Sequence, residues 1–142
     1  MMSRVLFSAQ SVHHATPTAL YADLDREFHF TFDPCPLRSA AHDGLARSWK
    51  GHRVFCNPPY GRGVGQWLAK SREPDVAVYL LPARTDTRWW HDYAMRADEI
   101  RFLRGRLRFG GHKGNAPFPS VVLVYSRPDL PPVTIFRNIP TP

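Results

Sequence analysis

This sequence lacks long apolar runs, closely spaced cysteines and histidine spacings typical of metal sites. No stretch is long enough to cross a membrane, and the N-terminal MMSRVLFSAQS has no extended apolar core of the kind found in signal peptides. The two cysteines, Cys35 and Cys56, lie in separate apolar segments, so we expect buried thiols and no secreted disulfide framework. The histidines are scattered without metal-ligand spacing. We therefore expect a cytosolic protein that has no bound metal and no contact with a membrane.

The composition is that of a small basic domain. The chain has 142 residues, about the size of one domain, and its hydrophobic content of 43% suffices for a core of one sheet and a few helices. The formal net charge is +7, which favours polyanionic partners such as nucleic acid. A generally basic surface without such a partner would give the same charge, so composition leaves both interpretations open.

The first helix signal begins at residue 16. Thr16 stands where an N-cap residue is expected, with Pro17 just inside the helix, and Leu20, Leu24 and Phe28 follow at four-residue spacing. This spacing predicts a helix over 16–28 with one apolar face. Segments typical of strands and helices then alternate along the chain. We expect strands over 28–33, 52–57, 76–83, 99–105, 106–110 and 119–126, and helices over 65–72 and 86–97.

This alternation predicts an α/β sheet with helical crossovers, in which the last strands pair antiparallel. The most apolar segment, 76–83, is expected to lie at its centre. Residues 1–15 are then an N-terminal extension, 16–126 the folded domain, and the proline-rich 127–142 an extended C-terminal tail.

Polar and proline-containing segments follow three of the predicted strands, at 33–34, 57–60 and 82–86. One such segment is adequately explained as a turn. Three at the same edge of a parallel sheet indicate a site, because α/β sheets bind ligands at the carboxyl ends of their strands.

The segment Asn57-Pro58-Pro59-Tyr60 has the groups needed to hold a planar amine. A residue before proline is kept out of the helical region, so Asn57 and Pro58 are held extended with their carbonyl groups at a defined angle. The side-chain oxygen of Asn57 and the main-chain oxygen of Pro58 can both accept from one exocyclic amine, and Tyr60 offers a face for a planar base. Such acceptors make the nitrogen nucleophilic, so we expect it to attack an electrophilic carbon.

This tetrapeptide resembles the catalytic signature of S-adenosylmethionine-dependent amino-group methyltransferases. A wider resemblance is carried by the segments TPTALYADLDREFHFTFDP, DGLARSW, VFCNPPYGRGVGQWLAKS, LLPARTDTRWWH, GRLRFGG and APFPS. Over about residues 16–125 the chain resembles the phage-type DNA N-6-adenine methyltransferase (Dam) family. The resemblance implies a single compact Rossmann-like methyltransferase sheet in 16–126, S-adenosylmethionine as cofactor and double-stranded DNA as partner. It assigns 57–60 to a flipped adenine. It also implies a phage or prophage protein of the bacterial cytoplasm, with a place in DNA methylation and restriction-modification.

The resemblance also assigns residues to the methyl donor. Thr16 and Pro17 match the segment that contacts the methionine end, Asp33-Pro34 the motif that contacts the amino group, and Asp43 the acceptor for the donor's adenine amine. Each position has a simpler interpretation. Thr16 is equally explained as a helix cap, and Asp33 and Asp43 as turn residues.

A basic segment after the last helix is a candidate phosphate contact. Residues 100–128 contain six Lys or Arg and no Asp or Glu. In a strand pair Arg106 and Arg108 would share one face while apolar neighbours pack on the other, with Lys113 in the adjoining glycine-rich loop. We expect a hairpin that binds DNA phosphates, with a solvated basic face as the alternative.

Two further residues are candidate contacts to the substrate. Arg84 follows the apolar segment 76–83 and is placed to contact a phosphate, while Phe118 is placed to stack on the extruded base; a core position explains Phe118 equally well. Asp86 is a candidate cap for the helix over 86–97.

The sequence departs from the family pattern in the donor loop. DPCPLRSA has no glycine, and only ten residues separate Asp33 from Asp43. A separate target-recognition domain is also missing, so short loops or a partner subunit would select the DNA sequence. A catalytically inactive DNA-binding module, and a methyltransferase acting on an RNA base or a protein glutamine amide, therefore remain open.

Overall fold

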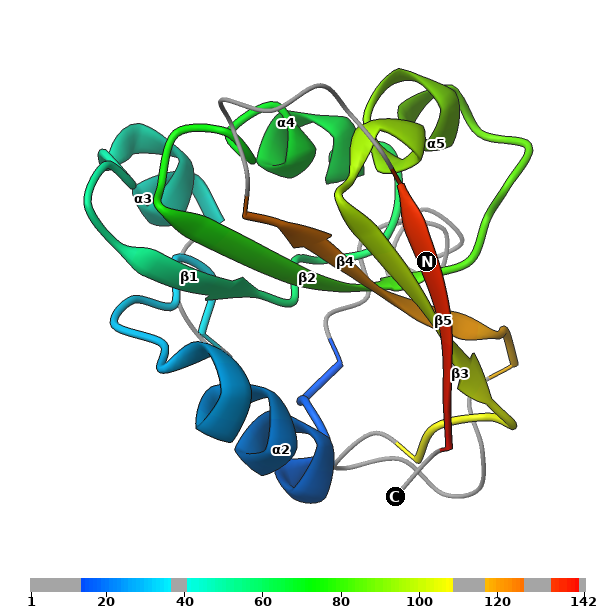
Figure 1. Ribbon diagram of the computed structural model, residues 1–142. Coiled ribbons are helices and arrows are strands. Elements are labelled where there is room, and N and C mark those ends of the chain that lie inside the picture. Colours follow the sequence, from blue (N-terminus) through cyan, green and yellow to red (C-terminus); the bar gives the residue numbers. More distant parts are fainter. Residues whose placement is uncertain (1–13, 37–40, 109–116, 127–133, 141–142) are drawn as a thin grey trace, which may run out of the picture.

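A five-stranded sheet with helices on both faces forms the centre of the protein (Figure 1). The computed structural model describes residues 14–36, 41–108, 117–126 and 134–140. The strand order is β1-β2-β4-β3-β5. The strands are β1 Arg53–Cys56, β2 Val76–Pro82, β3 Glu99–Arg104, β4 Ser120–Tyr125 and β5 Ile135–Pro140.

The sheet is mixed. β1 pairs parallel with β2 and β3 pairs parallel with β5, whereas β4 is antiparallel to both β2 and β3. The α/β class and the antiparallel pairing of the strands over 99–105 and 119–126 are confirmed. The expected Rossmann-like arrangement is not confirmed, because its strands would be mostly parallel. The middle strand is β4, and the fully buried β2 lies beside it.

Helices lie on both faces of the sheet (Figure 1). α2, Thr18–Phe28, packs on one face, and α3, α4 and α5 lie on the other. α3 is Ala41–Ala46, α4 is Val64–Leu68 and α5 is Arg88–Asp92, followed by a 3-10 turn over Ala94–Arg96. α4 and α5 are shorter than the predicted helices over 65–72 and 86–97.

The first helix begins and ends where the local backbone requires it. Leu20, Leu24 and Phe28 are buried as predicted, but Pro17 is the N-cap residue, so Thr16 does not cap the helix. At the other end His29 takes the left-handed conformation, φ 54°, and its N–H donates to the carbonyl oxygen of Asp25 at 2.8 Å.

Two predicted strands and part of the tail prediction were wrong. The segment 28–33 makes only a single bridge, in which Phe32 pairs parallel with Val54; Phe28 belongs to α2, and His29 after it takes the left-handed conformation rather than the extended one of a strand. Residues 106–108 form no strand, and the rest of the predicted strand lies outside the described residues. Within the segment expected to be an extended tail, Ile135–Pro140 forms β5 beside β3.

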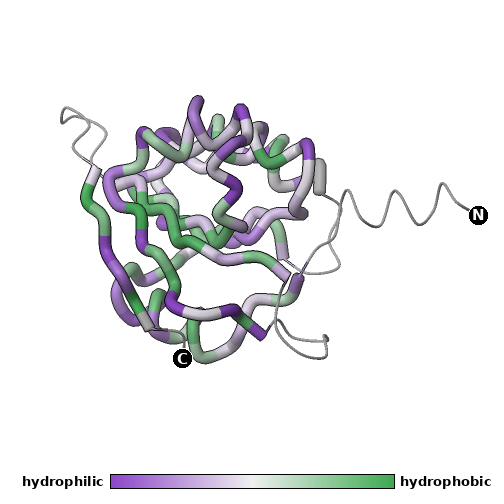
Figure 2. Tube along the Cα trace, turned by 90° about the vertical axis from the view of Figure 1, so that its right-hand side faces the viewer, coloured by the Kyte–Doolittle hydropathy of each residue, from purple (hydrophilic) through white to green (hydrophobic). Residues whose placement is uncertain are grey.

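The core fills the space between the sheet and its helices. Figure 2 shows hydrophobic stretches through the interior and hydrophilic ones toward the outside. Cys35 and Cys56 are buried free thiols, as expected, and burial raises the pKa of Cys35 to about 12. Within the part of the chain that the structure describes, no helix is long and apolar enough to cross a membrane.

A charged network joins α2 to the outer strands. The guanidinium of Arg101 on β3 donates two hydrogen bonds to the carboxylate of Glu27, at 2.7 and 2.6 Å, and one to Glu99 at 2.7 Å. Arg137 on β5 donates to the same Glu99 at 3.1 Å. The side chain of Arg101 is only 9% exposed, so these carboxylates compensate a largely buried charge.

Candidate functional site

The predicted site segments follow the carboxyl ends of neighbouring strands of the sheet. β1 and β2 are parallel, and Phe32 pairs parallel with Val54 of β1. The segments 33–34, 57–60 and 82–86 therefore follow neighbouring chains that run in the same direction. The three segments therefore lie on the same side of the sheet, as the sequence predicted, although the first of them follows a single bridge rather than a strand.

The side-chain amide of Asn57 is buried and held in one orientation. Asn57 is 3% exposed, and its Nδ2 donates to the main-chain oxygen of His14 at 2.6 Å and to Oγ1 of Thr16 at 2.9 Å. Its Oδ1 accepts a hydrogen bond from the hydroxyl of Tyr60 at 2.9 Å, and that hydroxyl lies 3.3 Å from the main-chain oxygen of Leu80. Thr16 therefore contacts the predicted catalytic residue.

Burial keeps the Tyr60 hydroxyl a hydrogen-bond donor. Tyr60 is 5% exposed, and desolvation raises its pKa well above the ordinary value, with the nearby Cys56 adding to the effect. The phenol therefore stays protonated throughout the physiological range. Pro58 is buried and Pro59 half-buried beside it.

Three aromatic rings form a cluster that includes Tyr60, the hydrogen-bond partner of this amide. The ring of Tyr60 lies 5.3 Å from that of His14 and 5.6 Å from that of Phe118, and the rings of His14 and Phe118 are 5.8 Å apart. These are the centroid distances of direct contact. A base therefore cannot lie between Tyr60 and Phe118 in this arrangement, so the predicted stacking role of Phe118 requires the rings to separate.

Arg84 borders the ring cluster. Its guanidinium lies 5.6 Å from the centroid of the Phe118 ring, and the residue is exposed. The predicted cap at Asp86 was wrong, because Thr87 caps α5: its hydroxyl accepts from the N–H of Trp90 at 3.2 Å and donates to the carbonyl of Arg84 at 2.8 Å. This cap fixes the backbone of the loop that carries Arg84.

The predicted donor residues Asp33 and Asp43 flank a tight backbone contact. A Cβ atom at Gly44 would stand 1.7 Å from the carbonyl oxygen of Pro34, so only glycine permits this approach. Oδ1 of Asp33 accepts from the N–H of Cys35 at 2.9 Å, as a turn residue would. Asp43 is exposed in the first turn of α3.

The predicted basic hairpin is described only in part. Arg106 and Arg108 are exposed, whereas Leu107 between them is 3% exposed, so the predicted alternation of faces is present without a strand. Lys113 lies outside the described residues.

His14 is the residue of this site that the sequence did not reveal. It is 9% exposed, it contributes one ring to the cluster, and its main-chain oxygen holds Asn57. A main-chain contact has no residue signature, and the predicted domain began two residues later. The described residues contain no group of three or more His, Cys, Asp and Glu side chains that could hold a metal ion.

One comparison with known proteins identifies the family. The model of the DNA N-6-adenine-methyltransferase (Dam) family matches residues 6–136, which extends on both sides of the range 16–126 expected for the domain. No curated protein and no solved structure matches the chain. The family description names DNA as the substrate and methyl transfer as the reaction, and methyl transfer in general uses S-adenosylmethionine as donor. Since the match spans most of the 142 residues, the chain belongs to the DNA N-6-adenine-methyltransferase (Dam) family.

Proposed function

We propose that this protein transfers a methyl group from S-adenosylmethionine to the N6 amine of an adenine extruded from duplex DNA. The observation that carries the proposal is the buried amide of Asn57. Its two N–H groups are engaged by the oxygens of His14 and Thr16, so the amide cannot turn its nitrogen toward a substrate. Its oxygen is thereby fixed as a hydrogen-bond acceptor.

A fixed acceptor suits an amine that must become nucleophilic. The two hydrogens of an adenine N6 amine would be accepted by Oδ1 of Asn57 and by the main-chain oxygen of Pro58. A carbonyl oxygen has two lone pairs, so Oδ1 can accept from the amine and from Tyr60 together. These bonds concentrate the lone pair on the nitrogen, and the proton that it loses passes to water. Catalysis is then mainly positioning and hydrogen bonding.

Entry of the base requires a movement at the ring cluster. In the structure Tyr60 contacts both His14 and Phe118, and the two contacts are 5.3 and 5.6 Å between centroids. Stacking of adenine on Tyr60, with Phe118 on the other side, would replace ring contacts within the protein by contacts with the base. Pro59 would keep the loop extended while this exchange takes place.

The residues near the Pro34–Gly44 contact fit the methyl donor in their chemistry. The carboxylates of Asp33 and Asp43 suit an ammonium group and a hydrogen-bond-donating adenine amine, and Thr16-Pro17 lies beside the amide of Asn57. Bound S-adenosylmethionine would supply an electrophilic methyl group.

Exposed basic residues would hold the DNA around the extruded adenine. Arg84 borders the ring cluster, and Arg106 and Arg108 are exposed; together with Lys113 they would contact phosphates. We infer that sequence selection comes from such short segments or from a partner subunit.

Mass spectrometry of digested nucleosides tests the proposal. Unmethylated DNA would be incubated with the protein and S-adenosylmethionine. The variant Asn57→Ala would be assayed in parallel, and Arg26→Ala, which changes an exposed residue of α2, would serve as the control. We expect N6-methyladenine from the wild type and the control, and a yield lower on the order of 100-fold or more from Asn57→Ala. Equal melting temperatures would exclude unfolding as the cause.

Other outcomes would overturn parts of the proposal. DNA binding without any methylated base from the wild type would favour an inactive module or a subunit that needs a partner. A methyl group found on RNA or protein would keep the chemistry of the amide and change the substrate. Undiminished methylation by Asn57→Ala would remove the role assigned to this residue.

A further inference from the structure

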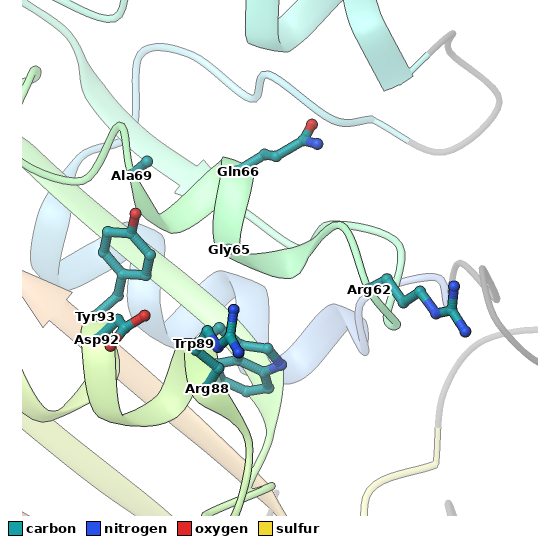
Figure 3. A pocket seen from close by; sticks show the side chains of 8 residues that line it. All are labelled: Arg62, Gly65, Gln66, Ala69, Arg88, Trp89, Asp92 and Tyr93. Atoms are coloured by element: carbon teal, nitrogen blue, oxygen red, sulfur yellow. The ribbon is translucent and has the colours of Figure 1, made fainter.

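A groove between α4 and α5 takes no part in the proposed chemistry. It has a volume of about 430 Å³ and is lined from α4, α5 and the loop before α4 (Figure 3). Gly65 of α4 forms its floor, where a Cβ atom would stand 3.6 Å from Cβ of Trp89 and 3.8 Å from the ring of Tyr93. The missing side chain leaves the half-buried faces of these two aromatic residues accessible from the groove.

One end of the groove adjoins the proposed catalytic edge. β1 and β2 are parallel, and each is followed by a site segment and then by a helix, α4 or α5. Residues at the beginnings of these helices therefore lie on the side of the sheet where Asn57 lies. Figure 3 shows Arg62 at one side of the groove, Arg88 next to Trp89, and Asp92 and Tyr93 at the other side.

Two cations and one anion line the groove. Arg62, Arg88 and Asp92 are all exposed, and Arg88 and Asp92 both belong to α5. Trp89 follows Arg88 directly and presents a partly buried ring to the same space. A groove with two cations and an aromatic ring in its lining suits a nucleic-acid strand, because the cations can pair with phosphates while the ring stacks on a base.

We propose that this groove holds the DNA strand that flanks the extruded adenine, with Arg62 and Arg88 on its phosphates and Trp89 against a neighbouring base. Extrusion of one nucleotide unstacks its neighbour, which then needs a new surface. The inference rests on the proposed function, since it takes the position of the strand from the adenine held at Asn57. The groove would also give the protein a DNA-contacting surface without a separate recognition domain.

Binding of a fluorescein-labelled duplex of randomised sequence, followed by anisotropy over a salt series, tests this inference. The double variant Arg62→Ala, Arg88→Ala should bind about tenfold or more weakly, and its logarithmic salt slope should fall by about two. The matched control Arg26→Ala, on α2 at the opposite face, removes one exposed cation and should change the affinity less than twofold.

A second pair of variants separates charge from folding. Gln66 is exposed and lines the groove from α4. Gln66→Glu adds a negative charge at almost the same volume and should weaken DNA binding several-fold, whereas Gln66→Lys should not weaken it. Equal melting temperatures for both would show that the effect comes from the charge in the groove.

The failure of this inference can be told from the failure of the proposed function. If the wild type methylates DNA while all groove variants bind with unchanged affinity and salt slope, the groove holds no DNA, and a protein partner becomes its better occupant. If the wild type neither binds nor methylates DNA, the proposed function fails and this inference fails with it.

Discussion

The contacts of the candidate site beside β1 differ in kind from the network at the other edge of the sheet. Beside β1, the site depends on neutral contacts: the amide of Asn57, the ring of Tyr60 and the close approach of Gly44 to Pro34. At the other edge, α2, β3 and β5 are joined by the charges of Glu27, Glu99, Arg101 and Arg137. Neutral contacts depend on shape, whereas ion pairs also respond to salt and pH. The contacts of Asn57 and Tyr60 should therefore respond less to salt and pH than the ion pairs of Arg101.

The largest effect is expected from a methyl group at the β1 edge. Gly44→Ala places Cβ against the backbone of Pro34, which cannot move as a flexible side chain would, so we expect a loss of about 3 kcal/mol or more in unfolding free energy. Gly63→Ala is the matched control, because nothing lies within 4 Å of its Cβ position. Urea denaturation of both variants gives the comparison, and equal stability would refute the tight contact.

At the charged edge, loss of Arg101 should have the next largest effect. Arg101→Met leaves the carboxylates of Glu27 and Glu99 without their main partner, and we expect a destabilisation of about 2–3 kcal/mol, since Glu27 is 48% exposed and partly screened. High salt should narrow the difference between variant and wild type in thermal melts. A difference that does not depend on salt would show that the network contributes through packing alone.

A smaller effect, on activity more than on stability, is expected from Thr16. Thr16→Val removes the oxygen that accepts from Nδ2 of Asn57, which leaves that donor with one partner fewer at a cost of about 1–2 kcal/mol. We expect kcat to fall on the order of tenfold with little change in the KM for DNA, and Thr16→Ser to restore most of it. A fall confined to the KM for S-adenosylmethionine would instead support a direct contact with the donor.

The smallest effect is a dependence on acidity. Hydrogen bonds from Arg101 hold the pKa of Glu27 below its ordinary value of 4.5, so this carboxylate contributes stability above that pH and loses it as the pH falls through the lowered pKa. We expect Glu27→Gln to be less stable by a few tenths of a kcal/mol near neutral pH and to match the wild type in acid. Melting curves between neutral and acid pH test this, and a constant offset would contradict it.

The sequence predicted the elements whose signal lies in their own side chains. Leu20, Leu24 and Phe28 fixed the buried face of α2, and the apolar segments became β1, β2, β3 and β4. It failed where a few backbone angles decide the outcome. His29, with its positive φ, ends α2 at Phe28, and the aromatic segment after it makes only one bridge. β5 was missed because the prolines around it are typical of a tail.

Much of the candidate site could be predicted for the same reason. Asn57 and Tyr60 carry recognisable chemistry, and the structure joins them by a hydrogen bond. The partner of Asn57 at His14 could not be predicted, because the contact is made by a main-chain oxygen that every residue has. The close contact between Pro34 and Gly44 could not be predicted either, because it is a property of three-dimensional packing.

The position of β5 also bears on the order in which the protein is made. β5 follows β4 in the chain and pairs parallel with β3, so the ribosome completes every other strand of the sheet before it. Until then β3 is an open edge on the nascent chain, and Phe102 has not yet met Phe136. Phe136, stacked on Phe102 at 6.0 Å, and Arg137, paired with Glu99, arrive only with this strand. The nascent polypeptide can thus assemble the segments around Asn57 before its far edge is protected from pairing with another chain.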